Sequence, residues 1–287
     1  LQGFRRTFPM AQDWSQREQF AFWYYGTDSE KPITVQLQDN RAPDPGPTGW
    51  TLVWSDEFDG ITGTSPLPGK WTHEIGNGFD QANNGWGNGE LEYYTAAPEN
   101  SATDGTGSLV ITANEIDPAT TELECWYGAC EYTSARLVSA QKFEMAYGRV
   151  EARLKLPYGQ GLWPAFWMLG SDIGEVGWPT CGEIDIMEHI GSIPDTVYGT
   201  IHGPGYSGGS GIGGSYTLDE GGFADDYHVF AIEWEPGVIR WYVDGTLFLT
   251  LTDQDIPADT EWVFDHPFFL ILNVAVGGTW PGYPDET

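Results

Sequence analysis

The sequence predicts an all-β protein built as an antiparallel sandwich. Short stretches rich in Val, Ile, Phe, Tyr and Trp are separated by turn signals such as Pro236-Gly237 and Asp244-Gly245. The content of 38 Gly and 19 Pro, with 14 each of Trp, Tyr and Phe, is typical of many short strands joined by loops. No amphipathic helices lie between these stretches, which favours antiparallel sheets over a βαβ arrangement.

The expected strands follow one another from Trp50 onward. We expect them at residues 51–55, 108–113, 148–156, 164–169, 183–189, 197–202, 228–235, 238–243 and 268–276. Between the sixth and seventh strands, the glycines of residues 203–214 predict a mobile loop beside a cleft.

Proline spacing predicts a domain boundary near the start of the chain. Residues 41–49 alternate Pro with Asp, Gly and Thr, which is typical of a stiff, extended linker. Residues 50–287 then form the main domain. Residues 1–40 contain two strand-like stretches, 20–25 and 33–37, and a lone hairpin is only marginally stable. We therefore expect residues 1–40 to be a fragment of a second β-sandwich or an extension that adds strands to the main domain.

The charge limits the partners. A net charge of −30, from 42 acidic and 12 basic residues, repels nucleic acid and anionic membranes, so a neutral ligand is favoured. No apolar run reaches the length of a membrane span, and the chain begins without a start Met or signal-peptide pattern. We expect the natural N-terminus to be missing, and the protein to be a monomer.

The cysteines predict an oxidising compartment. Cys125 and Cys130 bracket four residues and can close a short disulfide loop, which favours a secreted, extracellular protein. Cys181 remains, and a small buried thiol is its expected role. The histidines show no metal-ligand spacing, since His189 and His202 are thirteen positions apart and no His-Glu-x-x-His pattern occurs.

Three carboxylates crowd one apolar stretch. Glu183, Asp185 and Glu188 alternate with Ile184, Ile186, Met187 and Ile190, and burying several acids together should separate their pKa values. In a regular strand Glu188 would point to the face opposite Glu183 and Asp185. A β-bulge near Ile186 and Met187, with Met187 as the inserted residue, would bring all three onto one face, and bulges are frequent beside active sites.

Several further stretches, in order, identify a family. Among them are 54–59 (WSDEFD), 86–93 (WGNGELEY), 148–153 (GRVEAR), 161–169 (GLWPAFWML), the acidic stretch at 183–188, 202–209 (HGPGYSGG) and 273–282 (NVAVGGTWPG). With these, residues 50–287 resemble glycoside hydrolase family 16, and within it the laminarinases, which are endo-β-1,3-glucanases. The resemblance implies a jelly-roll β-sandwich of two antiparallel sheets with a concave substrate cleft. Residues 7–37 loosely resemble part of a galactose-binding-like carbohydrate-binding module.

The resemblance implies a retaining glycosidase. Glu183 is then the nucleophile, Glu188 the general acid/base, and Asp185 the residue that modulates Glu183. Such enzymes need one ionised and one protonated carboxyl on either side of the scissile bond and no cofactor.

The family motifs also imply a sugar-binding cleft. Sugars stack on aromatic rings and hydrogen-bond to short polar groups, so candidate platforms are Trp86, Trp163, Trp167 and Trp280, with Asn88, Arg136 and His202 as polar partners. Core packing is the alternative for each tryptophan, above all for Trp167 in its apolar strand.

Two features of the family are absent or unsupported. The chain stops before the last strand that such jelly rolls usually have, so we expect that strand to be lacking. That strand commonly supplies an Asp to a structural calcium, with backbone near Glu57 contributing, and the residues alone do not support this calcium site.

Alternatives to a β-1,3-glucanase remain open. The inserted residue of the acidic stretch resembles laminarinases, and agar-cleaving relatives share it. A family member acting on mixed-linkage glucan or agar is therefore the nearest alternative. A β-glucan-binding recognition module without turnover is a second, although related recognition proteins typically lack the catalytic glutamates.

Overall fold

The computed structural model describes residues 25–26, 32–33, 52–78 and 84–285. Two short strands before the main domain, β1 (Tyr25–Gly26) and β2 (Pro32–Ile33), pair antiparallel. The linker at 41–49 and the rest of residues 1–40 lie outside the described residues. None of the helices in the described ranges has the length and apolar character that crossing a bilayer requires.

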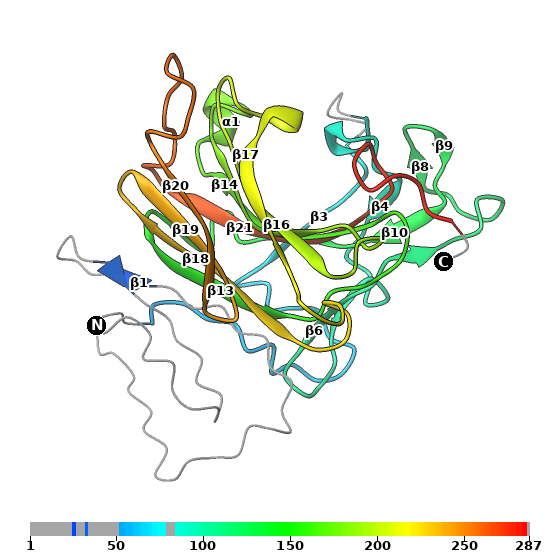
Figure 1. The fold of residues 1–287 in the computed structure, drawn as a ribbon. Coiled ribbons are helices and arrows are strands. Elements are labelled where there is room, and N and C mark those ends of the chain that lie inside the picture. Colours follow the sequence, from blue (N-terminus) through cyan, green and yellow to red (C-terminus); the bar gives the residue numbers. More distant parts are fainter. Residues whose placement is uncertain (1–24, 27–31, 34–51, 79–83, 286–287) are drawn as a thin grey trace, which may run out of the picture.

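The larger of two layered sheets carries eight strands (Figure 1). Its order is β17-β16-β15-β14-β21-β11-β3, with β12 also pairing with β21. The bounds are β3 (Thr72–Glu74), β11 (Arg136–Val138), β12 (Glu144–Met145), β14 (Leu162–Gly170), β15 (Glu183–His189), β16 (Thr196–His202), β17 (Ile212–Thr217) and β21 (Phe268–Val276). All its pairings are antiparallel.

The second layer is a four-stranded antiparallel sheet with the order β13-β18-β19-β20. Its strands are β13 (Gly148–Leu154), β18 (His228–Glu235), β19 (Val238–Val243) and β20 (Thr246–Thr252). Turns at Gly237 and Gly245, both with positive φ, join the last three strands as hairpins. The all-β sandwich predicted from the sequence is confirmed.

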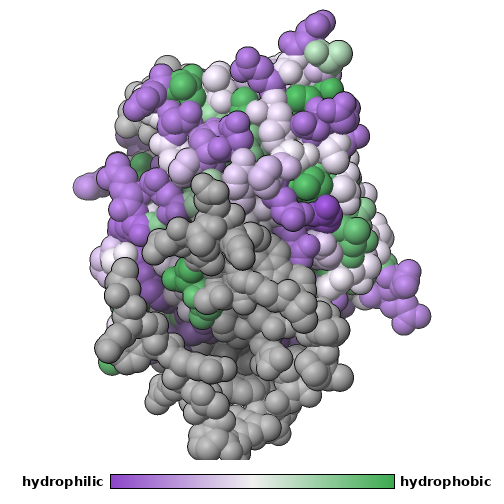
Figure 2. Space-filling model, turned by 90° about the vertical axis from the view of Figure 1, so that its left-hand side faces the viewer, coloured by the Kyte–Doolittle hydropathy of each residue, from purple (hydrophilic) through white to green (hydrophobic). Residues whose placement is uncertain are grey.

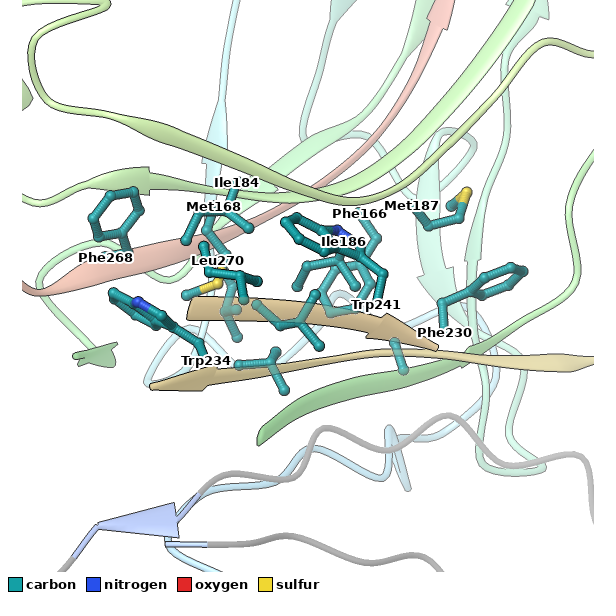
Figure 3. Packing of buried hydrophobic residues seen from close by; sticks show 14 of the residues in the cluster. Phe166, Met168, Ile184, Ile186, Met187, Phe230, Trp234, Trp241, Phe268 and Leu270 are labelled. Carbon is teal, nitrogen blue, oxygen red and sulfur yellow. The ribbon is translucent and has the colours of Figure 1, made fainter. Parts of the chain in front are cut away.

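Side chains that alternate along each strand fill the space between the layers (Figure 3). The larger sheet contributes Phe166 and Met168 from β14, and Ile184, Ile186 and Met187 from β15. The smaller sheet contributes, among others, Phe230, Ile232, Trp234, Ile239, Trp241 and Val243. The opposite face of the larger sheet is thereby left to carry polar and aromatic groups.

Smaller sheets and turns flank the two layers (Figure 1). Strands β4 (Glu92–Tyr94), β10 (Tyr132–Ser134) and β7 (Asn114–Glu115) form one small sheet, in which β4 and β10 are parallel. Two hairpins pair β5 (Ser101–Thr103) with β6 (Leu109–Ile111) and β8 (Glu124–Cys125) with β9 (Gly128–Ala129). The helical pieces are α1 (Ile173–Val176) and the 3-10 turns η2 (Asn84–Gly87) and η3 (Gly208–Ser210).

The disulfide loop forms as predicted. Cys125 and Cys130 are joined with an S–S distance of 2.03 Å, and Cys181 is a buried free thiol. Hydrophilic residues predominate on the described part of the face shown in Figure 2, as expected from the large acidic excess.

Two local predictions were wrong. No strand forms over residues 52–55, where Trp54 instead stacks on Phe143 with ring centroids 4.7 Å apart. The segment 203–214 is not one loop, because its end enters β17, where Gly213 and Gly214 pair with Thr200 and Gly199 of β16. Glycine has a low propensity for strands, but backbone pairing with β16 forms the strand here despite the glycines.

Candidate active site

A β-bulge in β15 sets the direction of the three carboxylates. On the β14 side, Asp185 lies opposite Trp167 and Met187 opposite Phe166, so Ile186 is left without a partner. Side chains of Ile186 and Met187 both enter the core (Figure 3). The predicted bulge is present, although the β14 register leaves Ile186 rather than Met187 as the extra residue. Two successive inward side chains return Glu188 to the face of Glu183 and Asp185.

A tryptophan of the other sheet supports the bulge from below. Trp241 of β19 is fully buried, and its Nε1 donates to the backbone oxygen of Asp185 at 2.7 Å. Gly199 of β16 lies across from the bulge, and a Cβ there would be 2.5 Å from Cδ1 of Trp241. The bulge therefore depends on a large ring beneath it and on a missing side chain beside it.

Each of the three carboxylates has a different polar neighbour. Trp178 Nε1 donates to Glu183 Oε2 at 2.7 Å, and Trp163 Nε1 donates to Glu188 Oε1 at 3.1 Å. His202 of β16, directly opposite Glu183, places its Nε2 at 3.2 Å from Asp185 Oδ2 and 3.9 Å from Glu183 Oε1. Each indole donor favours the ionised form of the glutamate it contacts.

Burial raises the pKa of all three acids. Burial first, and then the neighbouring Asp185, raise the pKa of Glu183 to about 8, while His202 and the Trp178 hydrogen bond oppose that shift. Burial also raises the pKa of Asp185 to about 7. For Glu188, burial and the charges of both Asp185 and Glu183 raise the pKa well above its usual range. Glu188 is thus the acid that holds its proton most firmly.

Arg136 lies between two indole rings. Its guanidinium is 4.5 Å from the ring centroid of Trp86 and 4.8 Å from that of Trp167, and it forms an ion pair with Glu74. Trp86 reaches this position from a left-handed backbone conformation, with φ 55°, in η2. These contacts hold both indoles in fixed orientations beside the carboxylates.

A chain of hydrogen bonds connects Trp167 to the loop that follows η2. Trp167 Nε1 donates to Asn273 Oδ1 at 2.8 Å, and Asn273 Nδ2 donates to the Tyr94 hydroxyl at 3.0 Å. Tyr94 in turn donates to Glu90 at 3.3 Å, whose other oxygen accepts from Asn88 Nδ2 at 2.8 Å. Asn88 is therefore oriented by a buried network rather than by solvent.

An aromatic cluster borders the carboxylates on the β16 side. The ring centroid of Trp280 is 5.4 Å from that of Trp163 and 5.1 Å from that of Tyr198. A pocket of about 350 Å³ opens beside it, lined by Tyr198, Thr200, Gly211, Gly213, Gly214, Ser215 and Trp280. The glycines give this pocket a floor of bare backbone.

The predicted site residues gather around one face of the larger sheet. Trp163 and Trp167 are partly exposed on β14, whereas Phe166 and Met168 enter the core between the sheets. Trp167 also packs against a second, smaller cluster that includes Leu169 and Ile271, so packing and a place at the cleft coexist for this tryptophan. Trp86 and Arg136 join Trp167, whereas Trp163 and Trp280 join Glu188.

Sequence reasoning missed several residues of the site. Trp178 was not singled out, although it lies five positions before Glu183, and neither were Asn273, Tyr94 and Tyr198. Trp178 lies between Gly177 and Pro179, and such a turn signal just before the acidic stretch could have been used.

Calcium near Glu57 stays a prediction. Burial raises the pKa of Glu57 to about 7, and neighbouring Asp56 is already engaged by Trp71 and Lys70. Within the described ranges, the acidic and histidine side chains close enough to share an ion are Glu183, Asp185 and His202.

Comparison with known proteins identifies the family. The model of glycosyl hydrolases family 16 matches residues 90–287. A β-glucanase from Rhodothermus marinus is 46% identical over 241 residues, covering 81% of this chain and 78% of that protein. Glucan endo-1,3-β-glucosidase A1 from Niallia circulans is 40% identical over 248 residues, and the match covers 83% of this chain but 36% of that longer protein.

A solved structure shows the same arrangement. The laminarinase catalytic domain from Thermotoga maritima superposes with a TM-score of 0.75 at 56% sequence identity, covering 83% of this chain and 91% of that one. Because the family model covers more than half of the chain and these relatives match most of it, the chain belongs to glycosyl hydrolases family 16.

Proposed function

We propose that this protein is a retaining, endo-acting glycoside hydrolase that cleaves β-1,3-glucan by double displacement. The observation that carries the proposal is the bulge in β15, which brings Glu183, Asp185 and Glu188 to one face with a different indole donor on each glutamate. The β-glucanase and laminarinase names of the similar proteins support the substrate.

In the first step, Glu183 attacks the anomeric carbon while Glu188 donates its proton to the glycosidic oxygen that leaves. Burial raises the pKa of Glu183 to about 8, and Trp178 and His202 oppose that shift. Burial and both neighbouring charges raise the pKa of Glu188 well above its usual range, so Glu183 ionises first and Glu188 keeps its proton. The product is a glycosyl ester on Glu183, with the leaving chain carrying the proton from Glu188.

In the second step, water releases the sugar. Once Glu183 is an ester its charge is gone, so the pKa of Glu188 falls and Glu188 can accept a proton from the attacking water. Asp185 contacts both Glu183 and His202 and modulates the nucleophile. Carboxyl groups and water complete the cycle, and no cofactor takes part.

The aromatic groups are assigned to substrate binding. Trp86 and Trp167, held by Arg136, offer ring faces on one side of the carboxylates, and Trp163 and Trp280 offer them on the other. Asn88 and His202 supply hydrogen-bonding groups to sugar hydroxyls. Platforms on both sides of the catalytic acids suit attack within a chain rather than at its end.

Product analysis tests this proposal. The protein is incubated with laminarin, lichenan, agarose and carrageenan, and reducing sugars and product lengths are measured. We expect intermediate oligosaccharides from laminarin before glucose accumulates. Activity on a galactan alone would overturn the substrate, and glucose as the sole early product would overturn endo attack.

Substitutions of the two glutamates distinguish an enzyme from a module that binds glucan without cleaving it. Glu183→Gln should lower kcat by roughly a thousandfold or more while laminarin binding persists. Glu188→Ala should abolish laminarin cleavage yet retain the first step on activated aryl glycosides, with rescue by azide. If the wild-type protein binds laminarin and releases no sugar, the recognition-module alternative replaces the enzyme.

We further propose that the protein acts as a secreted monomer. The Cys125–Cys130 disulfide is the supporting observation, since such bonds persist in oxidising compartments. Light scattering after size-exclusion chromatography should give the mass of one chain, 31.7 kDa. A doubled mass would refute the monomer.

A further inference from the structure

Three side chains of the active site share one small volume. Glu183, Asp185 and His202 each offer one ligand atom, and these three atoms all lie within 4.8 Å of one another. The nitrogen of His202 is 3.2 Å from the Asp185 oxygen and 3.9 Å from the Glu183 oxygen. Despite the shorter distance, Asp185 Oδ2 forms no hydrogen bond and is buried.

These separations suit a tetrahedral metal ion. Zinc binds imidazole nitrogen and carboxylate oxygen at about 2.0–2.2 Å, which places neighbouring ligands about 3.3–3.6 Å apart. The two edges from His202, 3.2 and 3.9 Å, bracket that length, and the third lies within 4.8 Å, so side-chain rotations that draw the two carboxylates together complete the geometry. A buried carboxylate oxygen without a hydrogen bond, facing an imidazole nitrogen, supplies an unused ligand atom.

The ligands are already held from behind. Trp178 Nε1 donates to Oε2 of Glu183 at 2.7 Å, while Oε1 faces His202 at 3.9 Å. The backbone at Gly211 packs on the imidazole so closely that a Cβ there would lie 2.4 Å from His202 Cε1. Fixed ligands lose little conformational entropy on binding an ion.

We propose that Glu183, Asp185 and His202 form a binding site for a borderline divalent metal ion such as Zn²⁺, and that the bound ion inactivates the enzyme. One imidazole and two carboxylates suit zinc, whereas Ca²⁺ and Mg²⁺ need six or more oxygen ligands. The ion takes the oxygen of Glu183 that would attack the sugar, so metal and substrate exclude each other. Removing the ion with a chelator restores activity.

Calorimetry with the metal alone tests the binding site. Zinc chloride is titrated into the metal-free protein, and we expect one ion per chain. His202→Gln and Glu183→Gln should each weaken binding at least tenfold, since even outer partners of metal ligands contribute about 10- to 100-fold. Circular dichroism and melting without zinc verify that each variant is folded.

A matched control lies on the other sheet. His228 pairs with Asp244 at 2.7 Å without a third ligand of this kind in the described part of the chain, so His228→Gln should bind zinc as the wild type does. Excess Ca²⁺ or Mg²⁺ should not displace the zinc. Absence of zinc binding, or equal loss in the His228 and His202 variants, would overturn the proposed site.

The inhibitory consequence rests on the proposed function and is measured separately. Laminarin hydrolysis is assayed with increasing zinc, and we expect competitive inhibition that a chelator reverses. If the protein binds zinc through His202 but has no glucanase activity, the proposed function is wrong and the metal site is still supported. Active enzyme whose zinc-bound form still cleaves laminarin would overturn the inhibition.

Discussion

Trp241 Nε1 donates a hydrogen bond of 2.7 Å to the backbone oxygen of Asp185, across the core from one sheet to the other. The bulge at Ile186 interrupts the regular ladder at this point, and a buried carbonyl without a partner is costly. The indole therefore satisfies the backbone group that the bulge releases. Catalytic geometry on one face of the sandwich thus depends on a core residue of the opposite sheet.

Trp241→Phe should reduce both stability and catalysis. The substitution leaves the Asp185 carbonyl unpaired and shrinks the ring under the bulge, which we expect to cost about 1–3 kcal/mol of unfolding free energy. The carboxylates lose their alignment, so kcat on laminarin should fall at least tenfold. Urea unfolding and steady-state kinetics measure the two effects.

Trp234→Phe is the control for that substitution. Trp234 is also fully buried, and its Nε1 donates to the Phe264 oxygen at 3.0 Å, away from β15. We expect a similar loss of stability with nearly unchanged kcat. Equal losses of kcat in both variants would show that Trp241 has no special relation to the bulge.

Gly199→Ala should disturb the packing of Trp241 under the bulge of β15. The new methyl group would meet Trp241 Cδ1 at 2.5 Å, which forces the ring or β16 to move. Overpacking of this kind costs about 1–3 kcal/mol. Gly214→Ala, on the paired residue of β17, would meet only the flexible Leu249 side chain at 3.2 Å and should be milder. Thermal melts and kcat rank the two variants, and the reverse order would contradict this packing.

The two indole donors should move different limbs of the pH profile. Activity requires ionised Glu183 and protonated Glu188. Trp178→Phe removes a donor that lowers the pKa of Glu183, so the acid limb of kcat should shift to higher pH. Trp163→Phe removes a donor from Glu188, so the alkaline limb should shift to higher pH. A shift of the same limb in both variants would contradict the assigned roles.

Burial of Glu183 should also make stability depend on pH. Its pKa is raised to about 8 in the folded protein, from an ordinary value of 4.5, so between these values the folded state binds the proton more tightly. Stability is therefore greatest at the acidic end of this window and falls as pH rises, by at most about 1.4 kcal/mol per pH unit for one group. In Glu183→Gln this part of the slope should vanish, as chemical denaturation at several pH values would show. A steeper decline in the variant would contradict the buried carboxyl.

Much of the fold follows from local pattern. Strands β15, β18, β19 and β21 begin and end where the alternation of apolar and polar residues and the Pro-Gly and Asp-Gly turns predict. Strand β17 was not predicted because its glycines have little preference for strands. Its pairing with β16 is what specifies this strand. Residues 52–54 look like the start of a strand because they are apolar, yet no strand forms there and the Trp54 ring stacks on Phe143 instead.

In the active site, too, local sequence patterns predict only part of the arrangement. Glu183, Asp185 and Glu188 could be predicted because they are close in sequence and because a single bulge places all three on one face of the strand. His202 reaches Asp185 through the β15–β16 register, which places it opposite Glu183, and a search for ligand spacing along the chain does not find it. The contact of Trp241 with Asp185 spans 56 positions and two sheets, so no local pattern encodes it.

Trapping of the covalent intermediate tests the central claim most directly. The protein is incubated with a 2-deoxy-2-fluoro laminaribiosyl fluoride, digested and analysed by mass spectrometry. We predict one glycosyl group per chain, attached to Glu183, and no label in Glu183→Gln. A label on Glu188 or Asp185 instead would contradict the assignment of the nucleophile and the bulged arrangement on which it depends.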